Sequence, residues 1–449
     1  MPQHESAVPT ARGRVPLLGH SISALRDPLA FIRTLSSYGP IVRIYLGPTP
    51  AYVLTTPDLI RQVSFGEAGH FHRDELREAI KVIVTGSVNV LSGTEHDLRR
   101  RMIAPAFRQA RLGVYATVAA EVANRWAEGF SDGAEVDLGS EAHSLVLETI
   151  SSTLFTARFS SDAQAAIRDN IPWLLGEVIR RGALPPEITR MRLIANRRFA
   201  AKSQQLRSAI GKVVTEYRRA DEDRGDVLSA LIAHTDAETG ATLSDSEIVD
   251  ELILVLAAGV GSEASMLAWL IHELTQHPDV AAAVHTELDA AVGTDPVTPE
   301  HIQSLPYLRQ VLQETLRFWA PWVSMLTAGD NVVVGDLAIP SGANVVFSPY
   351  MIHHDAEYFE NPEVFDPDRW APERAEDIDK KANMPFGVGK RRCPGNHYAL
   401  MAITLQAAAL LSRWEPVPDP SKKVKPSNQD FVMSPSRVPV TLRARVPAR

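Results

Sequence analysis

Apolar residues recur every three or four positions over much of this chain, which is the periodicity of a helix that buries one face. Local start signals agree with the pattern. Ser244 and Glu247 form a capping box ahead of an apolar run, and Pro299 and Pro306 suit the first turns of further helices. The periodicity predicts helices over residues 114–131, 139–156, 163–181, 190–220, 226–236, 244–276, 279–292, 299–318 and 396–413.

Strand patterns are fewer and lie towards the two ends of the chain. The predicted strands are residues 41–46, 51–54, 331–334, 344–347 and 438–442. Gly47-Pro48 separates the first two, which predicts a hairpin, and residues 339–342 separate the next two, which predicts a second pair. Residues 355–392 are rich in proline and show little regular pattern, a feature of long segments that are packed or functional.

Composition places the chain among globular proteins. It has 449 residues, of which 45% are hydrophobic and 22% charged. The net charge of −8 argues against binding to nucleic acid, since proteins with that task are usually basic. Because no repeat, linker or change of composition divides the sequence, we expect one α-rich α+β domain over residues 1–449.

The cellular setting also follows from composition. A single cysteine, Cys393, excludes an intramolecular disulfide and a cysteine-rich zinc site. Residues 1–13 are polar, without the apolar segment of a signal peptide, and the longest apolar run, residues 252–261, is too short to span a bilayer. We therefore expect a cytoplasmic protein without a membrane anchor.

The lone cysteine stands in a distinctive loop directly before an apolar helix. A helix N-terminus favours a thiolate, and a thiolate can be the axial ligand of a haem iron, although a lone cysteine is more often a structural one. The spacing of the surrounding residues favours the iron ligand over the structural cysteine. The fixed positions of the loop, F-x-x-G-x-R-x-C-x-G, are Phe386, Gly389, Arg391, Cys393 and Gly395.

This loop resembles the haem-binding loop of the cytochrome P-450 superfamily. The resemblance implies the mainly α (α+β) P-450 fold, with a large helical part and small β-sheets at the N-terminal side and near the C-terminus. It also implies haem b, with Cys393 as the ligand of the iron and the other four loop positions around the cofactor. Three further motifs match the family in its own order along the chain.

Glu314-x-x-Arg317 is similar to the family's E-x-x-R, and Arg369 to the arginine that precedes the cysteine loop. The resemblance implies that the three form a buried charge network that fixes this loop. Taken alone, Glu314 and Arg317 would be read as an ordinary ion pair on a solvated helix.

His96-x-x-x-Arg100 is similar to the pair that meets a haem propionate in this family. Residues four apart share one face of a helix, so both cations can reach one carboxylate. The competing reading is a solvated basic face. Because the segment 322–328 has no basic residue, the propionates are expected to depend on His96, Arg100 and Arg391.

The helix over residues 244–276 resembles the family's central helix but departs from its A-G-x-[D/E]-T motif. In one register Ala258 and Gly259 keep their places, Gly261 replaces the acid and Ser262 replaces the threonine. In the other, Glu263 is the acid and the hydroxyl is lost. We favour the first register, in which Ser262 holds the water or oxygen-side hydrogen bond, and leave open whether Glu263 takes part in proton delivery.

The implied substrate is a hydrophobic small molecule, because the candidate pocket segments are apolar. Those segments are residues 80–90, 173–178, 255–262, 322–326 and 431–433, with Trp322, Val323, Met325 and Val432 as candidate contacts. Plain core packing is the competing reading for each. A terpenoid is favoured, with a fatty acid or macrolide as alternatives.

The resemblance implies a monooxygenase of secondary metabolism that uses O2 and electrons from NAD(P)H. The electrons would arrive through a ferredoxin-type partner with its reductase, docked near Lys390 to Arg392 and Arg99 to Arg101. Two alternatives stay open: a haem-thiolate rearrangement enzyme or peroxygenase that needs no electron donor, and a non-catalytic haem protein that senses a ligand.

Overall fold

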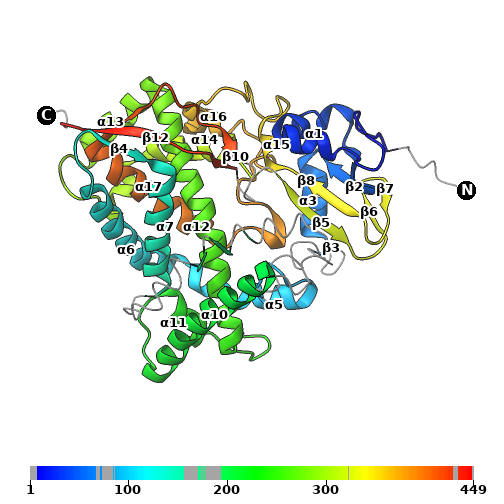
Figure 1. Cartoon of the computed structure of the whole chain (residues 1–449), viewed down its shortest axis with the longest axis horizontal. Helices are drawn as coiled ribbons and strands as arrows, with labels where there is room; N and C mark the ends of the chain where they lie inside the picture. The colour runs from blue at the N-terminus through cyan, green and yellow to red at the C-terminus, as the bar shows by residue number, and fades with distance from the viewer. Residues whose placement is uncertain are drawn as a thin grey trace, which may run out of the picture.

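The structure, a computed structural model, describes residues 8–66, 71–72, 84, 86–155, 170–171, 173–174, 177, 194–321, 323–427 and 433–446. A helical part and a sheet-rich part lie next to each other, and the long helix α12 (Asp245–Gln276) runs through the helical part (Figure 1). The segment before α17, coloured orange, lies between α12 and the sheet-rich part.

Helices make up most of the described chain. The α-helices are α1 (Ser21–Arg26), α2 (Pro28–Arg33), α3 (Pro57–Phe65), α5 (Gly93–Ile103), α6 (Gln109–Glu128), α7 (Leu138–Leu154), α10 (Ile194–Ala220), α11 (Val227–Ala233), α12, α13 (Pro278–Ala291), α14 (Pro306–Phe318), α15 (Pro349–His353), α16 (Pro372–Ala375) and α17 (Asn396–Arg413). Short 3-10 turns are η1 (Ser36–Tyr38), η2 (Ala104–Phe107), η3 (Pro299–Ser304), η4 (Pro367–Trp370) and η5 (Gly389–Arg391).

The predicted helices agree with these elements wherever the structure describes them, with two differences. The prediction for residues 163–181 falls almost wholly outside the described residues. The prediction for residues 299–318 is divided into η3 and α14, because Pro306 disfavours helical backbone at Leu305. The capping box is present: Ser244 N–H donates to Glu247 at 2.8 Å, and this fixes the first turn of α12.

The main sheet joins strands from distant parts of the chain. Its order is β1 (Ile41–Leu46), β2 (Thr49–Leu54), β8 (Asn344–Phe347), β5 (Ser324–Ala328) and β3 (Phe71–His72). The β1–β2 hairpin confirms the prediction around Gly47-Pro48. β2 and β8 are parallel, whereas the other neighbours are antiparallel.

The predicted pairing of residues 331–334 with 344–347 is wrong. β6 (Val332–Val334) pairs instead with β7 (Leu337–Ile339) across a tight turn at Gly335. β8 is buried along its whole length, so it belongs inside a sheet rather than in a hairpin at the surface.

Two smaller sheets lie near the end of the chain. β12 (Pro439–Ala444) pairs with β4 (Ala134–Asp137) on one side and β9 (Trp414–Pro418) on the other, which agrees with the predicted strand at 438–442. β10 (Pro426–Ser427) pairs with β11 (Ser434–Pro435).

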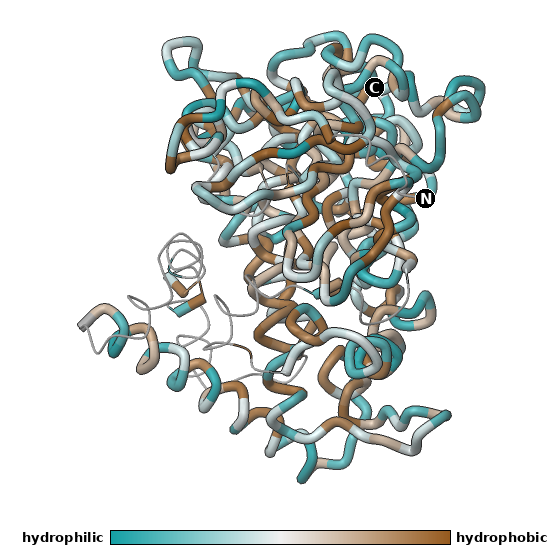
Figure 2. Tube along the Cα trace, turned by 90° about the vertical axis from the view of Figure 1, so that its right-hand side faces the viewer, coloured by the Kyte–Doolittle hydropathy of each residue, from teal (hydrophilic) through white to brown (hydrophobic). Residues whose placement is uncertain are grey.

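Two hydrophobic cores hold these parts together. The larger is built from α6, α7, α12 and α17, and the smaller surrounds the five-stranded sheet. Figure 2 shows hydrophobic positions gathered inside and hydrophilic ones on the outer loops. α12 is long and apolar enough to cross a membrane. However, 61% of its most apolar stretch of 18 residues is buried inside the protein, which is typical of a core helix.

Candidate active site

The cysteine loop is held by backbone geometry. Cys393 N–H donates to the carbonyl of Phe386 at 2.9 Å, which closes the loop three residues before α17 begins. Gly389 has a φ of +69°, and a Cβ there would collide with the carbonyl oxygen of Ser64. Glycine is therefore required at this position both for its backbone angle and for the close approach of α3.

Cys393 is exposed and lies three residues before the start of α17. Surrounding protein excludes enough water to raise the pKa of the thiol above its ordinary value. The Gly395 N–H, Arg100 and Arg392 oppose that effect. The Gly395 N–H at the start of α17 thus acts in the expected direction, and burial acts against it.

Three basic side chains converge beside this loop. His96 is buried on α5, and burial, followed by Arg391 and Arg100, lowers its pKa, while Asp97 raises it. Arg100 and Arg391 are half-buried, and burial lowers the pKa of each. Within the described part of the chain, neither arginine forms an ion pair with a carboxylate, since the nearby Asp97 pairs with Lys390 and His96. This set of cations suits an anionic ligand such as the carboxylates of haem.

The middle of α12 is open on one side. Ala258 is exposed although the helix is otherwise mostly buried, and a Cβ at Gly261 would meet no atom within 4 Å. Ser262 is half-buried, and its hydroxyl donates to the Ala258 carbonyl at 2.7 Å. Ala258, Gly261 and Ser262 therefore share an open face of the helix.

Glu263 lies on a different face of α12. It is buried, and it accepts a hydrogen bond from Gln406 of α17 at 2.8 Å. Burial raises the pKa of this carboxyl group to about 8, although the Gln406 hydrogen bond lowers it. Ser262 and Glu263 thus differ in burial and in hydrogen-bond partners, although both line one cavity.

One small cavity joins α12 to the cysteine loop. Its volume is about 70 Å³, and Gly259, Ser262 and Glu263 line it on one side and Gly395 and Tyr398 on the other. The remaining walls are mainly apolar and come from Phe107, Tyr115, Ile150, Thr153, Leu154, Val227, Val255 and Ala399. Gly395 of the cysteine loop and Gly259 and Ser262 of the central helix therefore line the same cavity.

The network around Glu314 is fully buried. Arg317 donates to both carboxylate oxygens at 2.7 and 2.9 Å, and Arg369 lies 3.6 Å from one of them. Arg317 also donates to the carbonyls of His353 and Pro362, which ties α14 to the segment before the cysteine loop.

Trp370 and the backbone of Asp366 complete this network, and sequence reasoning missed both. Trp370 Nε1 donates to Glu314 at 2.9 Å and the Asp366 N–H at 3.0 Å. Asp366 and Trp370 lie on either side of Arg369 in the sequence, so their closeness to this arginine could have indicated that they join the network. The geometry excludes the reading of Glu314 and Arg317 as a solvated surface pair.

The basic run beside His96 differs from the expected surface patch. Arg99 is buried and pairs with Glu247 and, at 3.1 Å, with Glu251. Arg101 pairs with Asp236 at 2.9 Å. Arg99 is therefore unable to contact a partner protein, and the prediction that it lines a docking patch is wrong.

Carboxylates at the start of α12 also hold the segment before α5. The Gly86 N–H donates to Asp250 and the Val88 N–H to Glu251, each at 2.8 Å. Arg207 of α10 contacts the other oxygen of Asp250. Burial raises the pKa of Glu251 to about 7.

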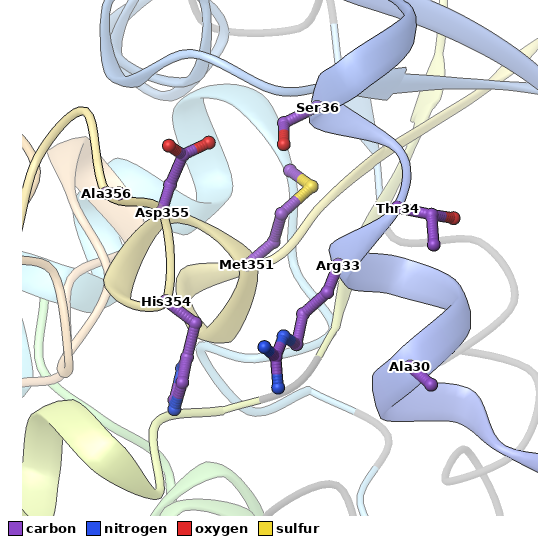
Figure 3. A pocket seen from close by; sticks show the side chains of 8 residues that line it. All are labelled: Ala30, Arg33, Thr34, Ser36, Met351, His354, Asp355 and Ala356. Carbon is purple, nitrogen blue, oxygen red and sulfur yellow. The ribbon is translucent and has the colours of Figure 1, made fainter. Parts of the chain in front are cut away.

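The predicted substrate contacts are described only in part. Val323 and Met325 are half-buried near the start of β5, whereas Trp322 and Val432 lie outside the described residues. A larger hollow of about 510 Å³ lies between α2 and α15 (Figure 3). It is lined by Arg33, His354, Asp355 and their neighbours and includes none of the predicted site residues.

Comparison with known proteins agrees with this geometry. The family model for Cytochrome P450 matches residues 9–442, and the chain belongs to the cytochrome P-450 family. Members carry a haem whose iron is bound by a cysteine thiolate. The fold and the comparisons define a P-450 monooxygenase, which takes O2, a hydrophobic substrate and electrons from a redox partner.

The curated relatives include three from Streptomyces. Pentalenene oxygenase of Streptomyces avermitilis is 33% identical over the whole of both chains. Cyclooctatin synthase and cyclooctat-9-en-7-ol 5-monooxygenase of Streptomyces melanosporofaciens are 33% and 32% identical over 93% of this chain and 92% of their own length. The haem domain of cytochrome P450DA shares the fold, with a TM-score of 0.86, 22% identity and 98% of both chains covered.

Proposed function

We propose that the protein inserts one oxygen atom of O2 into a terpenoid, as a cytoplasmic enzyme of secondary metabolism with residues 1–449 as one catalytic domain. The observation that carries this proposal is the cavity that brings Ser262 of α12 together with Gly395 of the cysteine loop. The terpenoid is supported by the relatives named for pentalenene and cyclooctatin, both of which are terpenoids.

Haem b supplies the oxygen chemistry when it is bound. Cys393, the single cysteine of the chain, is its proposed iron ligand. Phe386, Gly389, Arg391 and Gly395 would shape the loop around it. Ala258 would give the facing side of α12 a surface without a bulky side chain, and Gly259 would support it by allowing the close approach of Ile150. His96, Arg100 and Arg391 hold the propionates, since the two arginines are half-buried without a carboxylate partner among the described residues.

Ser262 has the role of the oxygen-side hydroxyl. Its bond to the Ala258 carbonyl fixes the hydroxyl hydrogen on the helix and leaves the oxygen lone pairs free to accept from a water. A water held there can pass protons into the site. Val323 and Met325, with Trp322 and Val432, form the apolar contacts to the substrate.

Electrons come from NAD(P)H through a reductase and a ferredoxin. The exposed cations Lys390 and Arg392 on the cysteine loop form the docking surface in this proposal, because ferredoxins are acidic. A peroxygenase or rearrangement enzyme would need no such donor, and a ligand sensor would form no product.

One experiment separates these functions. The purified holoenzyme is incubated with cyclic sesquiterpene and diterpene hydrocarbons, a fatty acid or a macrolactone under ¹⁸O₂, with ferredoxin, its reductase and NADPH. We expect a substrate-induced spin shift and one ¹⁸O atom in a terpenoid product. Turnover with hydrogen peroxide alone would favour the peroxygenase, and a spin shift without product would favour the sensor. Product from the fatty acid or macrolactone alone would overturn the terpenoid assignment.

A further inference from the structure

A short apolar turn projects from the N-terminal part of the described chain. Residues 12–18 are all exposed, whereas Ala11, Gly19 and His20 at its two ends are buried. The exposed fractions are 87% for Leu17, 50% for Leu18 and 37% for Val15, and Ile22 at the start of α1 is 50% exposed. No other run of the described chain gathers large exposed hydrophobic residues so closely.

Hydrogen bonds hold the ends of this turn firmly. Val15 and Gly19 exchange two backbone hydrogen bonds of 2.8 Å. His20 accepts from the Tyr45 N–H at Nδ1, 2.9 Å away, so its Nε2 carries the proton and donates to the Ala11 carbonyl at 2.9 Å. A Cβ at Gly19 would collide with the Tyr45 carbonyl oxygen. The projection is therefore a built feature of the fold, anchored on β1.

The backbone of the tip is unusual. Leu17 has a φ of +63°, a conformation that leucine rarely adopts. The protein thus holds a leucine in a disfavoured conformation and directs it into water. An observed outlier of this kind points to a function when burial does not explain it.

Basic residues outnumber acidic ones in the turn and the helix that follows it. Arg12, Arg14 and Arg26 are exposed, and the first acidic residue of the described chain is Asp27, whose side chain caps α2. Arg14 also lies over the Tyr45 ring, 3.6 Å from its centroid. This local excess of positive charge contrasts with the net charge of −8 for the whole chain.

We propose that this turn docks the protein on a membrane surface that carries anionic phospholipid. Apolar side chains at a convex tip enter the boundary between headgroups and acyl chains, while arginines beside them attract the negative surface. A protein partner is a poorer fit, because a stable interface buries about 800 Å² on each side and a seven-residue turn offers far less. The inference goes beyond the proposed function and does not depend on the identity of the substrate.

The test is sedimentation of the full-length holoenzyme with vesicles. One set contains phosphatidylglycerol mixed with phosphatidylcholine and the other phosphatidylcholine alone. We expect binding to the anionic vesicles at low salt, weakened by added salt and by the neutral composition. Replacing Arg12 and Arg14 by glutamine should weaken partitioning roughly fivefold for each arginine that contacts the surface.

The decisive variant is Leu17→Asn combined with Leu18→Ser, since asparagine tolerates the positive φ. We expect at least a tenfold weaker partitioning, by order of magnitude, because two apolar side chains no longer enter the membrane. The control is Val114→Ser, an exposed valine on α6, which should bind like the parent. Figure 1 shows α6 on the opposite side of the molecule from α1, which follows the turn. The carbon monoxide spectrum of each variant reports an intact fold independently of turnover.

Several outcomes would overturn the proposal. The first is a parent protein that does not bind anionic vesicles at low salt. The second is a leucine double variant that binds them as strongly as the parent. The third is a Val114→Ser variant that loses as much binding as the leucine double variant. A dimer that the leucine variant alone loses in ultracentrifugation, without vesicle binding by the parent, would assign the turn to a second copy of the chain instead.

Discussion

Gln406 of α17 donates a hydrogen bond to the carboxyl group of Glu263 on α12, with Nε2 and Oε1 2.8 Å apart and both side chains buried. No lysine, arginine or histidine of the described chain forms an ion pair with Glu263. The carboxyl group therefore lacks a compensating charge, and its raised pKa, about 8, keeps it protonated at neutral pH.

The first prediction concerns stability at alkaline pH. In the unfolded chain Glu263 has its ordinary pKa of 4.5, and in the folded protein about 8. Between these values folding takes up a proton, so this contribution to stability is full below pH 4.5 and is lost as the pH rises through 8. Glu263→Gln should be more stable than the parent at pH 9 by at least ~1 kcal/mol, because one pKa unit is worth about 1.4 kcal/mol.

Urea unfolding at pH 5 and pH 9 measures this difference. Glu121→Gln, an exposed glutamate on α6, serves as the control and should follow the parent at both pH values. Equal pH slopes in Glu263→Gln and the parent would show that the carboxyl group ionises freely in the folded protein.

The second prediction separates Ser262 from Glu263 in the reaction. Ser262→Ala should bind haem and substrate normally but release more of its electrons as peroxide, so that product per NADPH falls roughly tenfold. Ser262→Thr should hold or improve the yield, because the added methyl group fixes the rotamer and keeps the hydroxyl. Glu263→Gln should leave the yield unchanged, since that side chain faces α17.

Thr275→Ala, at the far end of α12, provides the comparison for loss of a hydroxyl elsewhere on the helix. The reverse order of damage, with Glu263→Gln impaired and Ser262→Ala silent, would establish the shifted register. Equal yields in all variants would remove both side chains from proton delivery.

The third prediction tests the iron ligand. Cys393→His should lose the red-shifted Soret band that the ferrous carbon monoxide complex of a thiolate haem shows, because imidazole replaces the sulfur. The measurement is the reduced difference spectrum with carbon monoxide. If that band persists in Cys393→His, the assignment of the ligand fails.

The fourth prediction concerns the network around Glu314. Glu314→Ala leaves Arg317 buried without its carboxylate and should cost about 3–5 kcal/mol and most of the bound haem. Arg369→Ala should act in the same direction. Thermal unfolding midpoints and haem content per chain report both effects.

Glu148→Ala is the matched comparison, since it removes an exposed partner of Arg125 and should change stability by less than about 1 kcal/mol. A normal midpoint and full haem content in Glu314→Ala or Arg369→Ala would mean that the buried pair does not support the cysteine loop.

Local features of the fold were predictable, and distant pairings were not. The β1–β2 hairpin follows from two apolar runs beside Gly47-Pro48, because such a hairpin needs only neighbouring residues. The partners of β8 do not follow from its own pattern. A short buried strand has the same apolar pattern whichever strand it pairs with. The sequence therefore predicts the wrong partner for residues 344–347.

The candidate site shows the same division. The spacing around Cys393 and the order of the other motifs identify the family from sequence. The burial of Glu263 against α17 did not follow from the sequence, because it depends on the packing of two helices. The burial of Arg99 does not follow from the sequence, because its partners Glu247 and Glu251 lie far away along the chain.

The main sheet also constrains how the chain acquires its structure during synthesis. β2 pairs in parallel with β8, so Ala51 meets Asn344 only after most of the polypeptide has been made. Until then, one edge of an apolar hairpin has no partner, and unpaired edges invite association with other chains. Pairings between such distant segments also form slowly. Weak induction, which lowers the concentration of incomplete chains, should therefore raise the yield of soluble protein.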